Sequence, residues 1–141
     1  MSKPVTDAMQ DALAGEHAAA YAYSVIGGRL DYGTTYQELA ARHFRDHRAR
    51  RDALIALLGD AGADPVGADP AYELPVAVES DSDAQRVGQQ VEDRCSVLYA
   101  GIVATATGQP RRFGVTALGE AAVAGLEWGA PPVALPGVES P

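Results

Sequence analysis

Hydrophobic positions recur along this chain at helical spacing, in long stretches free of interior proline. Between residues 5 and 29, Met9, Leu13, Ala20 and Tyr23 return at intervals of three, four or seven residues, which is typical of one face of an α-helix. Similar stripes run through residues 35–62, 82–107 and 110–128. Because proline is poorly tolerated inside a helix, the positions of the nine prolines indicate the same division. The sequence therefore predicts four helices and an all-α fold.

Local signals at the helix ends support this division. Thr35 is followed by Glu38, and Ser82 is followed by Gln85; both pairs have the spacing of a capping box. We expect these two boxes to begin the second and third helices. Pro110 suits a position just before or inside the start of the fourth helix, where its missing N–H costs nothing.

The connections between the helices differ in length, and this difference predicts the topology. Short turns join the first helix to the second and the third to the fourth, which makes each pair antiparallel. Residues 63–80 contain three prolines and no sustained period, so they form one long crossover between helices two and three. This is the connectivity of a ferritin-like four-helix bundle. Residues 1–141 are thus predicted as one domain, with an extended or disordered tail at 130–141.

Charge and cysteine content exclude several classes of protein. The net charge of −8 argues against nucleic acid or an anionic membrane as the partner. A single cysteine, Cys95, excludes an internal disulfide framework, and we expect it to be a buried, inert thiol. We expect neither a secretory signal nor a membrane span, and hence a cytoplasmic protein. Helix faces rich in alanine and glycine favour close approach between subunits and predict a homodimer.

Acidic residues occupy the predicted interior face of three helices. Glu16, Glu92 and Glu120 each share a helical stripe with apolar residues, and His43 lies on the broad buried face of the second helix. These four side chains are part of the ligand set of a carboxylate-bridged dimetal site, which needs two further ligands. One hypothesis is therefore a metal-binding protein or metal-dependent oxidoreductase that holds a single iron or manganese ion.

A second hypothesis needs no metal and follows from the basic segment at residues 42–51. Ten consecutive helical residues cannot all face water, so His47 and either Arg50 or Arg51 must lie near the interior. A buried guanidinium requires a carboxylate opposite it, and Glu16 and Glu92 are the interior ones. We therefore predict a buried ion network without a cofactor.

Two further residues, Arg94 and Tyr99, are assigned to this network. On this hypothesis the protein is a non-catalytic structural or interaction module. The sequence leaves open whether it has an enzymatic activity.

Four segments carry a resemblance to a known family: Gly-Glu-His-Ala-Ala-Ala-Tyr-Ala-Tyr at 15–23, His-Arg-Ala-Arg-Arg-Asp at 47–52, Asp-Pro-Ala-Tyr-Glu-Leu-Pro at 69–75, and Glu-Asp-Arg at 92–94 with Tyr99. In this order and spacing they resemble DUF4439, a small ferritin-like domain of actinobacteria with no known function. The resemblance covers residues 6–137. It implies a ferritin-like four-helix bundle and no particular activity.

Overall fold

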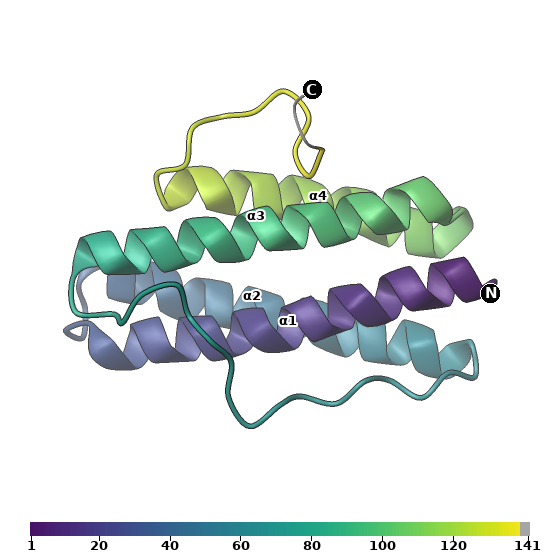
Figure 1. Cartoon of the computed structure of the whole chain (residues 1–141), viewed down its shortest axis with the longest axis horizontal. Helices are drawn as coiled ribbons and strands as arrows, with labels where there is room; N and C mark the ends of the chain where they lie inside the picture. Colours follow the sequence, from purple (N-terminus) through teal and green to yellow (C-terminus); the bar gives the residue numbers. More distant parts are fainter. Residues whose placement is uncertain (139–141) are drawn as a thin grey trace.

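The computed structural model describes residues 1–138, and that part of the chain forms four helices and no strand (Figure 1). They are α1 (Lys3–Arg29), α2 (Thr35–Asp60), α3 (Asp81–Thr105) and α4 (Gly108–Glu127). The predicted all-α, four-helix fold is confirmed, and Pro110 lies in the first turn of α4. Within residues 1–138, no helix combines the length and the apolar character needed to cross a membrane.

The predicted connectivity is also present. In Figure 1, α1 and α2 run antiparallel, α3 runs in the same direction as α2, and α4 returns beside α3. The crossover between α2 and α3 is fastened to α1 by the side chain of Gln10, whose Nε2 donates to the Asp64 carbonyl oxygen at 2.7 Å. The Oε1 of Gln10 accepts from the Val66 backbone N–H at 2.9 Å, and His17 Nε2 lies 2.9 Å from the Val66 carbonyl oxygen. These contacts hold the start of the crossover against α1.

Both predicted N-caps are displaced from their true positions. α2 is capped at Thr34, and Thr35 is already its first helical residue. α3 is capped at Ser80, whose hydroxyl accepts from the backbone N–H of Asp83 at 3.2 Å, so Ser82 lies inside the helix. The predictions at Thr35 and Ser82 were wrong because an extended residue with a hydroxyl group, Thr34 or Ser80, lies before each of them. Ser80 caps α3 with its side chain, whereas the Thr34 hydroxyl makes no cap and donates to the Asp31 carbonyl oxygen at 2.7 Å.

The core consists of two apolar clusters separated by a polar layer. One cluster lies where α1 begins, and its members include Met9, Leu13, Leu54, Leu58 and Ile102. The other lies at the opposite end of the bundle and is built around Tyr23, Ile26, Ala84, Val87 and Trp128. The buried charged and imidazole side chains between them are Glu16, His43, His47, Arg50 and Glu92. The middle of the bundle therefore positions the candidate site.

Candidate functional site

His47 lies at the centre of the polar layer, between two carboxylates. Its Nδ1 is 2.5 Å from Glu16 Oε2, and its Nε2 is 2.9 Å from Glu92 Oε2. All three side chains are at most 1% exposed. Burial alone would lower the pKa of His47, but Glu16 and Glu92 raise this pKa well above its ordinary value. Both ring nitrogens therefore donate a proton, and His47 is a buried imidazolium.

Arg50 is the second buried cation. Its Nε donates to Glu16 Oε1 at 3.3 Å, and its Nη1 donates to Glu120 Oε2 at 2.6 Å. Nη2 is 3.3 Å from both ring nitrogens of His47 and therefore lies over the face of the imidazolium, which has no acceptor to offer. Burial lowers the pKa of Arg50, but the Glu16 carboxylate raises it above its ordinary value. The two buried carboxylates are thus balanced by two buried cations.

Two tyrosines donate further hydrogen bonds to these carboxylates. Tyr23 donates its hydroxyl to Glu92 Oε2 at 2.5 Å, and Tyr99 donates its hydroxyl to Glu16 Oε1. Burial and the adjacent carboxylate raise the pKa of each tyrosine, so both remain protonated donors. Burial would raise the pKa of Glu16, but His47 and Arg50 hold it below its ordinary value. We call these six side chains the central network: Glu16, Tyr23, His47, Arg50, Glu92 and Tyr99.

His43, one turn before His47 on α2, belongs to a different arrangement. Trp128 Nε1 donates to His43 Nδ1 at 2.9 Å, so this nitrogen carries no proton. His43 Nε2 is 3.3 Å from Glu127 Oε1, and Glu127 also pairs with Arg42. Burial lowers the pKa of His43, and the carboxylates of Glu92 and Glu127 offset this only in part. His43 is therefore a neutral imidazole.

The structure brings five of the predicted site residues together, and these are Glu16, His47, Arg50, Glu92 and Tyr99. It places Arg51 outside the central network, at the surface, where it pairs with Asp52 at 2.9 Å. One residue along a helix is a rotation of about 100°, so Arg50 and Arg51 cannot face the same interior. Arg94 is exposed for the same reason, because two residues after Glu92 the helix faces the opposite side.

Glu120 reaches the central network only from its rim. Its side chain is 53% exposed, and its one contact with the network is Arg50. Ala117 and Ala121 are the α4 residues that face the interior at this level. Glu120 lies at the edge of the helical stripe that contains Ala117 and Ala121. The sequence pattern did not distinguish this edge from the middle of the stripe.

Two residues of the polar layer were missed. Tyr23 could have been found, since it lies seven residues after Glu16 on the same helical stripe. Trp128 depends on a more distant feature, because its indole packs against Gly88 of α3. A Cβ atom at Gly88 would lie 2.4 Å from the indole ring. Trp128 can therefore reach His43 only because Gly88 has no side chain.

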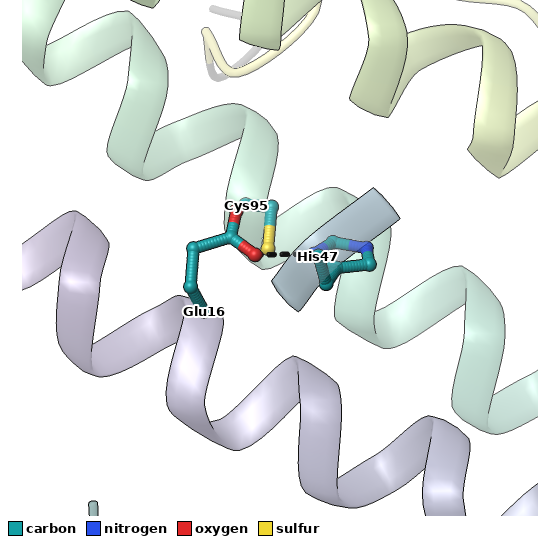
Figure 2. A group of neighbouring side chains, drawn as sticks. All are labelled: Glu16, His47 and Cys95. Carbon is teal, nitrogen blue, oxygen red and sulfur yellow. Dashed lines mark hydrogen bonds and ion pairs between the residues drawn. The ribbon is translucent and has the colours of Figure 1, made fainter. Parts of the chain in front are cut away.

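The predicted metal ligands do not converge. His43 is occupied by Trp128 and Glu127, and Glu120 is half exposed. Within residues 1–138, the donor atoms that do lie within 4.8 Å of one another belong to Glu16, His47 and Cys95, which approach from α1, α2 and α3 (Figure 2).

The group of Glu16, His47 and Cys95 does not fit a metal ion as arranged. Two ligands of one ion lie roughly 3 Å or more apart, given metal–ligand distances of about 2 Å, whereas Glu16 Oε2 and His47 Nδ1 are hydrogen-bonded at 2.5 Å. His47 has no free lone pair, and burial raises the pKa of the Cys95 thiol to about 11. Metal ligands must be deprotonated, so this chemistry favours the ion network.

A groove between α2 and α4 connects the central network with the surface. Its volume is about 860 Å³, and His47 and Arg50 are among its lining residues. Two ion pairs cross it, Arg42 with Glu127 and Arg50 with Glu120. Charged pairs therefore join α2 and α4 at the level of the network.

Sequence and structure comparisons place the chain among relatives of unknown function. The sequence model of a family described as a domain of unknown function, DUF4439, matches residues 8–140. The chain belongs to this family. The predicted resemblance is thereby confirmed. No curated protein matches the sequence.

A crystal structure of a conserved hypothetical protein, rv2844, from Mycobacterium tuberculosis is similar to this chain. The TM-score is 0.84 and the sequence identity is 33%, over 91% of this chain and 96% of the other. The similarity extends over nearly the whole fold and adds no activity.

Proposed function

We propose that this chain is a non-catalytic, ferritin-like module in which a buried ion network takes the place of a metal centre. The observation that carries the proposal is the position of the His47 imidazolium, which bridges Glu16 on α1 and Glu92 on α3. A metal ion that bound these carboxylates would have to remove the protons of His47 and compete with the guanidinium of Arg50.

The protonation states of the remaining polar groups also support a structural role. Cys95 is buried, and burial raises its pKa to about 11, so a nucleophilic thiolate is disfavoured at neutral pH. The pKa values of Tyr23 and Tyr99 are raised by burial and by the carboxylates they contact. These groups are suited to holding the bundle together, since none is poised to exchange a proton near neutral pH.

We further infer that the module works as a homodimer. Exposed apolar side chains follow one line of α4, where Val115, Val123 and Leu126 are each about half exposed. Gly119 is exposed on the same line, and a helix surface with so small a residue lets a second helix approach closely. Light scattering should give twice the chain mass of 14.7 kDa; a species of 14.7 kDa at micromolar concentration would contradict the dimer.

The metal question is tested by titrating the purified chain with Mn²⁺ and, without oxygen, with Fe²⁺. We expect neither stoichiometric binding by calorimetry nor a rise in melting temperature. His47→Ala removes the cation between the two carboxylates and should create affinity for a divalent ion, since carboxylates left unpaired in the interior need a new counter-charge. His43→Ala is the matched control and should bind no metal. One equivalent of metal in the unmodified protein, lost in Glu16→Gln, would establish the metal-dependent alternative instead.

A further inference from the structure

The outer face of α4 is apolar and uncovered. This helix packs mainly against α3 and touches α2 at few places. Within residues 1–138, more than half of the large hydrophobic side chains that are exposed lie at residues 115–138. On α4 itself, Val115, Val123 and Leu126 are 53%, 58% and 47% exposed. Because monomeric proteins rarely leave such side chains grouped at the surface, this face indicates a protein partner.

The valines of this face are arranged symmetrically about Gly119. Val115 lies four residues before Gly119 and Val123 lies four residues after it, so all three follow one face of the helix. A Cβ atom added at Gly119 would meet nothing within 4 Å, so the space above this residue is open. A second helix can therefore approach α4 closely at Gly119, with a valine on either side of the contact.

The charges of α4 are divided between its two halves. Arg111 and Arg112 lie within its first five residues, whereas Glu120 and Glu127 follow Gly119. This order is opposite to the one that the helix dipole favours, with acidic residues first and basic residues last. A second α4 that runs antiparallel would bring its acidic half to the basic end of the first. The charge pattern therefore complements a copy of itself.

We propose that two copies of this chain pair through α4, antiparallel, about a two-fold axis that passes beside Gly119. The inference rests on the homodimer proposed above and names its interface. In this arrangement Val115 of one copy meets the partner subunit's Val123, and the contact is repeated by symmetry. Arg112, seven residues before Gly119, lies opposite the partner subunit's Glu127, which is eight residues after the same glycine.

The charged groups around this face permit the pairing. Arg112 is exposed and has no acidic partner within residues 1–138. Glu127 pairs with Arg42, but its side chain is still 32% exposed, so a second guanidinium can reach it. Glu120 lies near the crossing and is already paired with Arg50 at 2.6 Å. The crossing therefore brings together no acidic groups that lack a cation.

The direction of the pair is tested by disulfide cross-linking. Val115→Cys and Val123→Cys, one of them with a mass tag, are co-expressed and oxidised; the native Cys95 is buried. We expect a mixed disulfide between the two variants. Two copies of Val115→Cys would lie about 12 Å apart along the helix axis, and a disulfide needs Cα atoms within about 7 Å. Disulfides of each variant with itself would indicate a parallel pair and overturn the proposal.

The crossing point is tested separately with Gly119→Cys, which should form a disulfide-linked dimer. Gly59→Cys is the matched control, because Gly59 is an exposed helical glycine of α2 with open space around it, and it should not cross-link. A dimer that cross-links neither at 119 nor between 115 and 123 would overturn this interface and leave the homodimer standing. A species of 14.7 kDa would overturn both.

The charge pairing is tested with Arg112→Glu, which faces the partner subunit's Glu127 twice in each dimer. We expect the dissociation constant of the dimer, measured by sedimentation equilibrium, to rise about tenfold or more. An acidic residue near the start of α4 suits the helix dipole, so weaker pairing would not reflect a weaker helix. Arg86→Glu, at an exposed position of α3, is the matched control and should leave the constant unchanged. Equal effects of the two substitutions would overturn the proposal.

Discussion

His43 and His47 lie one turn apart on the same face of α2, and both are almost fully buried, yet one is neutral and the other is charged. His47 is held between Glu16 and Glu92 and is an imidazolium. His43 accepts a hydrogen bond from Trp128 and is neutral. Burial disfavours the charged form of both rings. The difference therefore comes entirely from what α1, α3 and the end of α4 present to each ring.

The comparison shows how partner geometry outweighs burial. An indole N–H demands a lone pair, so Trp128 fixes one nitrogen of His43 in the unprotonated form. The carboxylate on the other side, Glu127, is 32% exposed and shared with Arg42, so its field at His43 is weakened. Glu16 and Glu92 are fully buried, and their charges act on His47 at close range. One helix thus carries a permanent cation and a neutral acceptor within 6 Å of axial rise, about one turn.

The largest expected effect on stability comes from removing a carboxylate that contacts His47, compared with removing one that contacts His43. Glu16→Gln leaves two buried cations with one buried carboxylate and should lower the free energy of unfolding by about 3–5 kcal/mol. Glu127→Gln is the matched substitution at the half-buried partner of His43 and should cost less than about 1 kcal/mol. Urea unfolding at pH 7 measures both. Equal losses would show that the two histidine environments do not differ as described.

A smaller expected effect is the change in the free energy of unfolding with pH that His47 causes. The folded pKa of His47 lies well above the ordinary 6.5. Its stabilisation is complete below about pH 6.5 and is lost as pH rises towards the folded pKa, because the native state holds a proton that the unfolded chain releases. From pH 6.5 to 8 the free energy of unfolding should fall by up to about 1.4 kcal/mol per pH unit.

The contribution of His43 to stability changes with pH in the opposite direction. Its folded pKa is lowered, so it reduces stability as pH falls below about 6.5. Urea unfolding across this range should show the decline above pH 6.5 in the unmodified chain and a flatter profile in His47→Gln. An unchanged slope in the variant would assign the titration to another group.

The smallest expected effect on stability is that of changing Arg51, which lies outside the central network next to Arg50. Arg51 lies next to Arg50 in sequence but pairs with the exposed Asp52 at the surface. Arg51→Gln should therefore change the free energy of unfolding by less than about 0.5 kcal/mol. Arg50→Gln, which removes the partner of Glu16 and Glu120, is the comparison and should cost several times more. A large loss on changing Arg51 would mean that it reaches the interior.

The fold was predictable because prolines and long helical stripes mark the four helices independently. The site was predictable only to the level of a helix face. Period 3.6 places Glu16, His47 and Glu92 towards the centre, but it does not decide between Arg50 and Arg51 or show that Glu120 lies at the edge of its stripe. These choices depend on how α2 and α4 are rotated about their axes.

The fate of His43 was beyond sequence patterns. Its partner Trp128 follows the last turn of α4 and reaches the bundle only because Gly88, on α3, has no side chain. Such a contact links residues from three helices, and no spacing within one helix encodes it. The charge state of His43 was settled by this contact.

The central network also has a consequence for assembly, because its charges are divided between two helical hairpins. The α1–α2 hairpin brings Glu16, His47 and Arg50, which is one positive charge in excess, and the α3–α4 hairpin brings Glu92. An axial slide of one hairpin past the other by one helical turn would separate these partners. A slide would leave Glu92 buried without its imidazolium, at a cost of several kcal/mol. The buried charges thus fix how the two hairpins align, because they stabilise one register and destabilise registers shifted by one turn.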